Sequence, residues 1–138
     1  MKLNWEIIKR LLEKFEDETI SDYLHSVGKL PEYVELENFE KREKLRIEAK
    51  NQEKIVFGHL LLCLDGKFIE GIEIKIVGNF EYAYGLFSPR LTLAGYELLE
   101  KLRDESVWNR IKSKASLIGV PLTVETISAI TTKLISEL

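Results

Sequence analysis

The fold is decided by residues 51–87, which read NQEKIVFGHLLLCLDGKFIEGIEIKIVGNFEYAYGLF. Apolar residues recur at helical spacing, and Asn51 is a suitable N-cap, so the pattern predicts a helix over residues 51–64. Asp65-Gly66 ends this helix, because glycine accepts the left-handed capping conformation. Apolar and polar residues then alternate on both sides of Gly78-Asn79, which predicts a two-stranded hairpin. A helix followed directly by a hairpin is the arrangement of the recognition helix and wing in a winged helix-turn-helix domain.

The residues before this stretch predict helices and short strands. Residues 4–17 form an amphipathic pattern that predicts a helix with Asn4 as its N-cap. The residues after it are compatible with a short helix that ends at Gly28. Alternating patterns over residues 33–39 and 45–49 predict two strands. We therefore expect residues 20–43 to be an insertion into the winged-helix core.

The residues after the hairpin predict three further helices. Ser88-Pro89 is expected to end the second strand, and Thr92, Ser106 and Thr123 are candidate N-caps. The predicted fold class is α+β: one winged helix-turn-helix-like domain over residues 1–138, with a two-stranded wing and extra C-terminal helices. Residues 106–138 are expected to form this C-terminal helical extension.

Composition and charge limit the class of protein. Of the 138 residues, 45% are hydrophobic and 31% charged, which is typical of a globular chain. Residues 1–40 hold five Lys/Arg and ten Asp/Glu, a balance of -5, whereas Lys41 to Lys54 hold six basic and three acidic residues. The single cysteine, Cys63, cannot form an internal disulfide. The N-terminus has no apolar signal core and no run reaches membrane-spanning length, so a cytoplasmic protein without membrane contact is expected.

The basic stretch makes double-stranded DNA a candidate partner. Basic side chains at the start of the predicted recognition helix suit phosphate, as does the positive end of the helix dipole. The candidate DNA-binding residues are Arg46, Lys50, Asn51, Gln52 and Lys54, with Lys75 and Asn79 on the wing and Arg90 beyond it. The alternative interpretation is a solvated surface of mixed charge, because glutamates are interleaved with these residues.

A protein partner is the second hypothesis. The predicted recognition helix contains no arginine, and Phe57, Gly58 and Leu61 cannot contact base edges through hydrogen bonds. In this alternative the chain is a non-enzymatic interaction module that binds a host or phage protein through the acidic N-terminal third and residues 20–43.

Enzymatic and metal sites are not indicated. His59 and Cys63 stand four residues apart, but a zinc site needs three or four ligands and His25 is the only other histidine. We expect His59 and Cys63 to pack in the core. The carboxylates form no acid-base motif, and the glycines occur singly, unlike those of a phosphate-binding loop. The chain is therefore predicted to be no enzyme and to need no cofactor.

The last helix carries an isoleucine-rich stripe. Its hydroxyl-bearing flank permits close helix packing, which makes this helix a candidate homodimer interface. The alternative is that the stripe folds back on its own domain. The candidate dimerisation residues are Ile127, Ile130, Leu134 and Leu138.

Several short motifs of the chain belong together: RLTLAGYELL at 90–99, LRD at 102–104, VWNRIK at 107–112, GVP at 119–121, VFGHLLLCL at 56–64 and the N-terminal IIKRLL at 7–12. In these motifs the chain resembles an uncharacterised phage and prophage family, DUF2513. The chain departs from the family at 65–69, where it reads DGKFI, and in the extra residues near 20–43. The resemblance implies a winged-helix shape and a phage or prophage setting, and it implies no active site. Together with the basic stretch, it makes a DNA-binding transcriptional regulator of phage or prophage type the first functional hypothesis.

Overall fold

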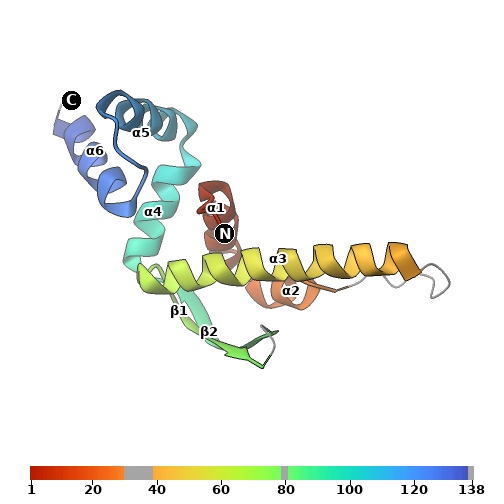
Figure 1. The fold of residues 1–138 in the computed structure, drawn as a ribbon. Helices are drawn as coiled ribbons and strands as arrows, with labels where there is room; N and C mark the ends of the chain where they lie inside the picture. Colours follow the sequence, from red (N-terminus) through yellow and green to blue (C-terminus); the bar gives the residue numbers. More distant parts are fainter. Residues whose placement is uncertain (30–38, 79–80, 137–138) are drawn as a thin grey trace. The chain divides into compact units, whose positions relative to one another are not determined.

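The computed structural model describes residues 1–29, 39–78 and 81–136, and it has six helices and one two-stranded antiparallel sheet among them (Figure 1). The elements are α1 (Trp5–Glu16), α2 (Ile20–Ser26), α3 (Phe39–Asp65), β1 (Ile69–Val77), β2 (Glu81–Leu91), α4 (Leu93–Arg103), α5 (Glu105–Ile118) and α6 (Val124–Ser136). The chain divides into two compact units, Met1–Tyr96 and Glu97–Leu138. The α+β class is confirmed.

The N-terminal helix forms as predicted. The Asn4 side chain accepts a hydrogen bond from the Glu6 amide at 2.9 Å, which caps α1. Ile8, Leu11, Leu12 and Phe15 form its buried face. In α2, Ile20 and Leu24 are also buried, so this part of the predicted insertion belongs to the core.

Helix α3 is where the structure differs most from the prediction. The strand predicted over residues 45–49 is wrong, because these residues lie inside one helix of 27 residues that begins at Phe39. Asn51 is accordingly an interior residue and not an N-cap. Leu45 and Ala49 are four residues apart, a spacing that suits a helical stripe as well as an alternating strand. The neighbouring Glu, Lys and Arg residues have high helix propensity and favour the helix. Of the strand predicted over residues 33–39, Phe39 begins α3 and the rest lies outside the described residues.

The predicted hairpin is confirmed, and it is longer than expected. Pairing runs from Val77–Glu81 to Ile69–Leu91 and shifts between Glu70 and Ile72. Gly71 lies within this shift and has a φ of 83°, and Ser88, in the opposite strand, has a φ of 54°. This irregularity accommodates Ser88-Pro89, so the strand bends there and continues, and does not end as predicted.

The hairpin packs on α3 through aromatic rings. The Phe57 and Tyr82 rings stack with centroids 5.0 Å apart, and the Tyr84 centroid lies 5.6 Å from that of Phe57. Tyr82 pairs with Ile76, and Tyr84 with Ile74, so these residues occupy the hairpin face that contacts α3.

Two side chains fix the ends of the first unit. His59 is fully buried; its Nε2 accepts a hydrogen bond from the Asn4 amide at 3.0 Å, and its Nδ1 lies 2.7 Å from the Ile55 carbonyl oxygen. The Thr92 hydroxyl accepts from the Gly95 amide at 3.0 Å and donates to the Lys67 carbonyl at 2.6 Å. His59 is therefore a core residue that anchors the N-terminus, and Thr92 is the predicted cap of α4.

The second unit comprises the end of α4 together with α5 and α6. Asp104, and not Ser106, caps α5 by accepting from the Val107 amide at 3.1 Å, whereas Thr123 caps α6 as predicted. The buried residues of this second unit are Leu98, Leu99, Leu102, Trp108, Ile111, Ala115, Ile127 and Ile130.

The burial of the isoleucine stripe changes the dimer hypothesis. Ile127 is fully buried and Ile130 is 5% exposed within the single chain, so neither side chain is available to a second copy. Leu134 is half-buried, and Leu138 lies outside the described residues. Ile127 and Ile130 therefore pack within the single chain, and a homodimer through this helix stays a prediction.

A search of the described helices finds none that is long and apolar enough to cross a membrane.

Cys63 offers a direct test of the core of the first unit. Its side chain is buried, and desolvation raises the pKa of its thiol to about 12. Because the thiolate is the reactive form, we expect native protein to resist a thiol-specific reagent at neutral and mildly alkaline pH. Protein unfolded in urea should react at once and with one equivalent. Rapid labelling of the native protein would show that α3 does not pack as described.

Candidate nucleic-acid interface

Four basic side chains lie along one exposed row of α3. Arg42, Arg46, Lys50 and Lys54 are spaced four residues apart, and all four are exposed. In an α-helix each such step advances about 6 Å along the axis and turns by about 40°, so neighbours in the row are adjacent on the surface. The row extends over about 18 Å of helix. We call these four residues the basic row.

Of the three glutamates interleaved with this row, Glu48 lies on another side of the helix, whereas Glu43 and Glu53 each stand three residues from a member of the row. Glu48 lines a groove on another side of α3, beside α1 and α2. Glu53 is half-buried and faces Gly28 at the end of α2. Glu43 remains near the row, where its carboxylate lies 3.4 Å from the Arg46 guanidinium in an exposed ion pair. Such a pair contributes little energy and is readily exchanged for another anion.

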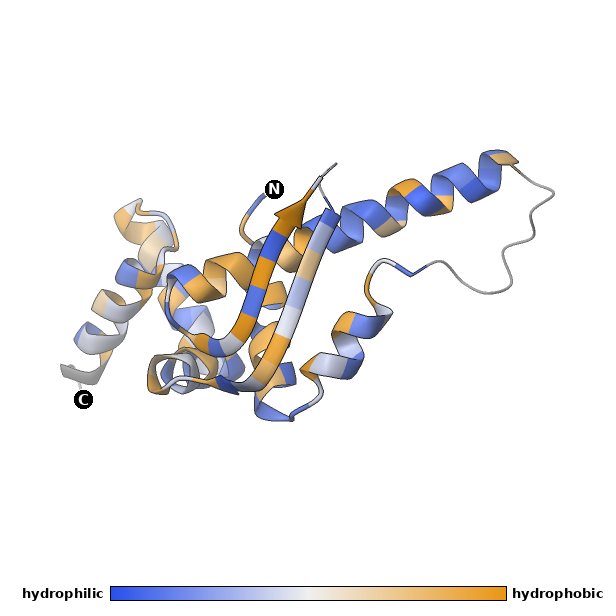
Figure 2. Ribbon diagram, turned by 90° about the horizontal axis from the view of Figure 1, so that it is seen from below, coloured by the Kyte–Doolittle hydropathy of each residue, from blue (hydrophilic) through white to orange (hydrophobic). Residues whose placement is uncertain are grey.

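The N-terminal half of α3 is accessible to a macromolecule. Buried α3 residues are confined to its second half, from Val56 onward. Figure 2 shows that the part of α3 leading away from the hairpin is predominantly hydrophilic. Phe39 and Ile47 are exceptions in this half, with exposed fractions of 73% and 59%.

Gln52 lies away from the basic row, and Asn51 lies between the row and a neighbouring groove. Both line the groove between α1, α2 and α3. The Gln52 side-chain oxygen accepts a hydrogen bond from the Gly28 amide at 3.4 Å. Gln52 therefore faces another side of α3, whereas Asn51 also lines a shallow hollow with Arg46 and Lys50. The helix dipole also gives no support at Lys50, since α3 begins at Phe39.

The predicted wing contacts are separate from the basic row as well. Lys75 pairs with Ala83 and so lies on the hairpin face opposite to Tyr82 and Tyr84, which contact α3. Arg90 forms an ion pair with Glu70 at the base of the hairpin. Asn79 lies outside the described residues. Of the candidates, the structure thus brings together Arg46, Lys50, Lys54 and Asn51, and it places Gln52, Lys75 and Arg90 elsewhere.

Arg42 is the member of the row that was not among the candidate contacts. Arg42 was predicted only as part of the basic stretch, because the residues after it, 45–49, were expected to form a strand. The spacing of four residues from Arg42 to Lys54 is the signal that identifies it, and this signal has meaning only on a continuous helix.

Comparison with known proteins places the chain in a family. The family profile described as "Hypothetical protein (DUF2513)" matches residues 2–121. The chain belongs to the DUF2513 family. An uncharacterized protein of Haemophilus influenzae is 24% identical over 140 residues, which cover 100% of this chain and 98% of that protein. No solved structure matches.

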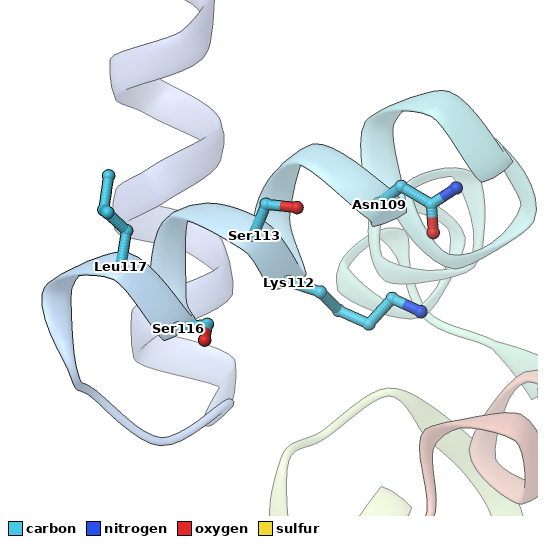
Figure 3. A pocket seen from close by; sticks show the side chains of 5 residues that line it. All are labelled: Asn109, Lys112, Ser113, Ser116 and Leu117. Atoms are coloured by element: carbon cyan, nitrogen blue, oxygen red, sulfur yellow. The ribbon is translucent and has the colours of Figure 1, made fainter.

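A second surface of this DUF2513 protein lies in the C-terminal unit. An open hollow of about 790 Å³ runs along α5 and is lined by Asn109, Lys112, Ser113, Ser116 and Leu117 (Figure 3). None of these five residues is a carboxylate, and the Lys112 Nζ lies 5.9 Å from the centroid of the Trp108 ring. Trp108 itself is buried, which agrees with a packing role. The hollow therefore offers hydrogen-bonding groups but no acid-base pair.

The part of the DUF2513 chain that the structure describes contains no group of three or more His, Cys, Asp or Glu residues able to hold a metal ion.

Proposed function

We propose that this DUF2513 protein binds double-stranded DNA through the basic row of α3. The observation that supports the proposal is the alignment of four exposed cations at four-residue spacing on the less buried half of the helix. An α-helix fits the major groove of B-form DNA, and successive cations about 6 Å apart can each meet a phosphate.

The order of α2, α3 and the hairpin also supports a winged-helix interpretation of the first unit. In that interpretation α3 is the recognition helix and the hairpin is the wing. The rings of Phe57 and Tyr82 would hold the wing against α3.

The geometry favours backbone contacts over base readout. Arginine and lysine side chains neutralise phosphates whatever the sequence, whereas sequence discrimination needs hydrogen bonds to base edges. Gln52 is turned toward the groove beside α1 and α2, which leaves Asn51, beside Arg46 and Lys50, as the one base-reading candidate of α3 near the row. We therefore propose binding with little sequence preference. A role as a phage or prophage transcriptional regulator would require a further base-reading surface, and it stays a prediction.

The proposal is tested by fluorescence anisotropy of a labelled random-sequence duplex titrated with the protein at several salt concentrations. Four phosphate contacts predict that log K falls with log salt with a slope of about −3.6. Micromolar affinity at low salt that weakens in this way supports the proposal. Absence of binding at low salt would refute it.

A second candidate is a non-enzymatic module that binds a host or phage protein. The supporting observation is the exposure of Leu117 and Ile118 at the end of α5, with exposed fractions of 86% and 55%. Affinity capture with wild-type protein and with the Leu117→Ser/Ile118→Ser variant would test it. A protein retained by the wild type and lost with the variant supports this candidate, and equal retention argues against this surface.

A further inference from the structure

A groove in the first unit lies between α1, α2 and α3 and has a volume of about 370 Å³. This volume falls at the lower end of the range for small-molecule sites, roughly 300–1,000 Å³. Its lining residues are Ile7, Arg10, Tyr23, Glu48, Asn51, Gln52, Ile55 and Val56. The basic row takes no part in this groove, because none of its four members lines it.

Two opposite charges line the groove and remain available. Arg10 comes from α1 and Glu48 from α3, and both are exposed. Neither forms an ion pair or a hydrogen bond with another residue in the described parts of the chain. The groove therefore presents one guanidinium and one carboxylate that do not form an ion pair with each other.

Neutral polar groups and an apolar base complete the lining. The Tyr23 side chain is half-buried, and the Asn51 amide has no hydrogen-bond partner among the described residues. Ile7 is half-buried and Val56 is 4% exposed, so the groove has an apolar base as well as polar walls. This combination is typical of a site for a small amphiphilic molecule.

We propose that the groove binds a free α-amino acid with an apolar side chain. The Arg10 guanidinium matches the planar geometry of a carboxylate, and the Glu48 carboxylate pairs with the ammonium group. The apolar side chain packs against Ile7 and Val56. A simple anion fits less well because Glu48 would repel it, and a simple cation fits less well because of Arg10.

The test is isothermal titration calorimetry of the full chain with L-leucine, L-methionine and L-valine in the absence of DNA. Two analogues remove one charge each: L-leucinamide lacks the carboxylate, and N-acetyl-L-leucine lacks the ammonium group. We expect at least one of the three amino acids to bind. If leucine binds, each of its two analogues should bind at least tenfold more weakly than leucine. Arg10→Gln and Glu48→Gln should each reduce affinity at least tenfold.

Matched controls keep the result interpretable. Arg110→Gln, on exposed α5, and Glu40→Gln, near the start of α3, make the same chemical changes outside the groove. Both should bind like the wild type, and circular dichroism should show that all four variants are folded. The proposal is overturned if none of the three amino acids binds, or if Arg10→Gln and Glu48→Gln bind as well as the controls. Either result leaves the DNA proposal untouched, because the titration contains no DNA.

Discussion

Replacing Lys50 and Lys54 together with glutamate is expected to abolish measurable binding of duplex DNA at physiological salt. In the proposed complex each lysine would make a charge-assisted contact to phosphate, and its loss should cost roughly tenfold or more in affinity. Charge reversal adds repulsion from the phosphates. Both side chains are exposed, so the free energy of unfolding should change little. Anisotropy titration of a random duplex measures the effect.

The matched control is Lys2→Glu/Lys44→Glu, which makes the same change in net charge. Lys2 is exposed ahead of α1, and Lys44 is exposed on a different side of α3 from the row. This variant should lose far less affinity than Lys50→Glu/Lys54→Glu. Equal losses in the two variants would mean that overall charge, and not the basic row, governs binding.

Replacing Gly95 with alanine is expected to lower the free energy of unfolding by about 3 kcal/mol. A Cβ at this position would overlap the carbonyl oxygen of Phe68, which is backbone and also accepts the Thr92 amide at 3.0 Å. The start of α4 would have to move away from Phe68, at a cost that exceeds the gain in helix propensity of about 1 kcal/mol. Urea denaturation measures the change.

Gly85→Ala is the control for this prediction. Gly85 lies in β2, and a Cβ there would meet no atom within 4 Å. Alanine should therefore be neutral or stabilise the protein slightly, since it restricts the unfolded chain. If both variants were equally stable, the close approach of α4 to Phe68 would be contradicted.

Local signals in the sequence predicted the elements that carry them. Asn4 and Thr92 supplied helix caps, and alternation around Gly78 supplied the hairpin. The same logic failed at residues 45–49, because five residues are too few to distinguish a period of two from a helical period. The burial of Ile127 could not be predicted either, since an apolar stripe is the same whether it packs on its own chain or on a second copy.

The candidate interface was predicted in part. Arg46, Lys50 and Lys54 were identified from charge alone, which does not depend on the exact secondary structure. The sides of α3 on which Arg42, Asn51 and Gln52 lie could not be assigned from the sequence, because they depend on where α3 begins. The position of Lys75 likewise needed the hairpin register relative to the rings on α3.

The most direct test of the account is to map the DNA contact by nuclear magnetic resonance. Amide chemical shifts of isotope-labelled protein would be followed during titration with a short random-sequence duplex. The account predicts that the largest changes cluster on α3 around Arg42, Arg46, Lys50 and Lys54. Changes centred on the hairpin or on α5, with α3 unaffected, would contradict it.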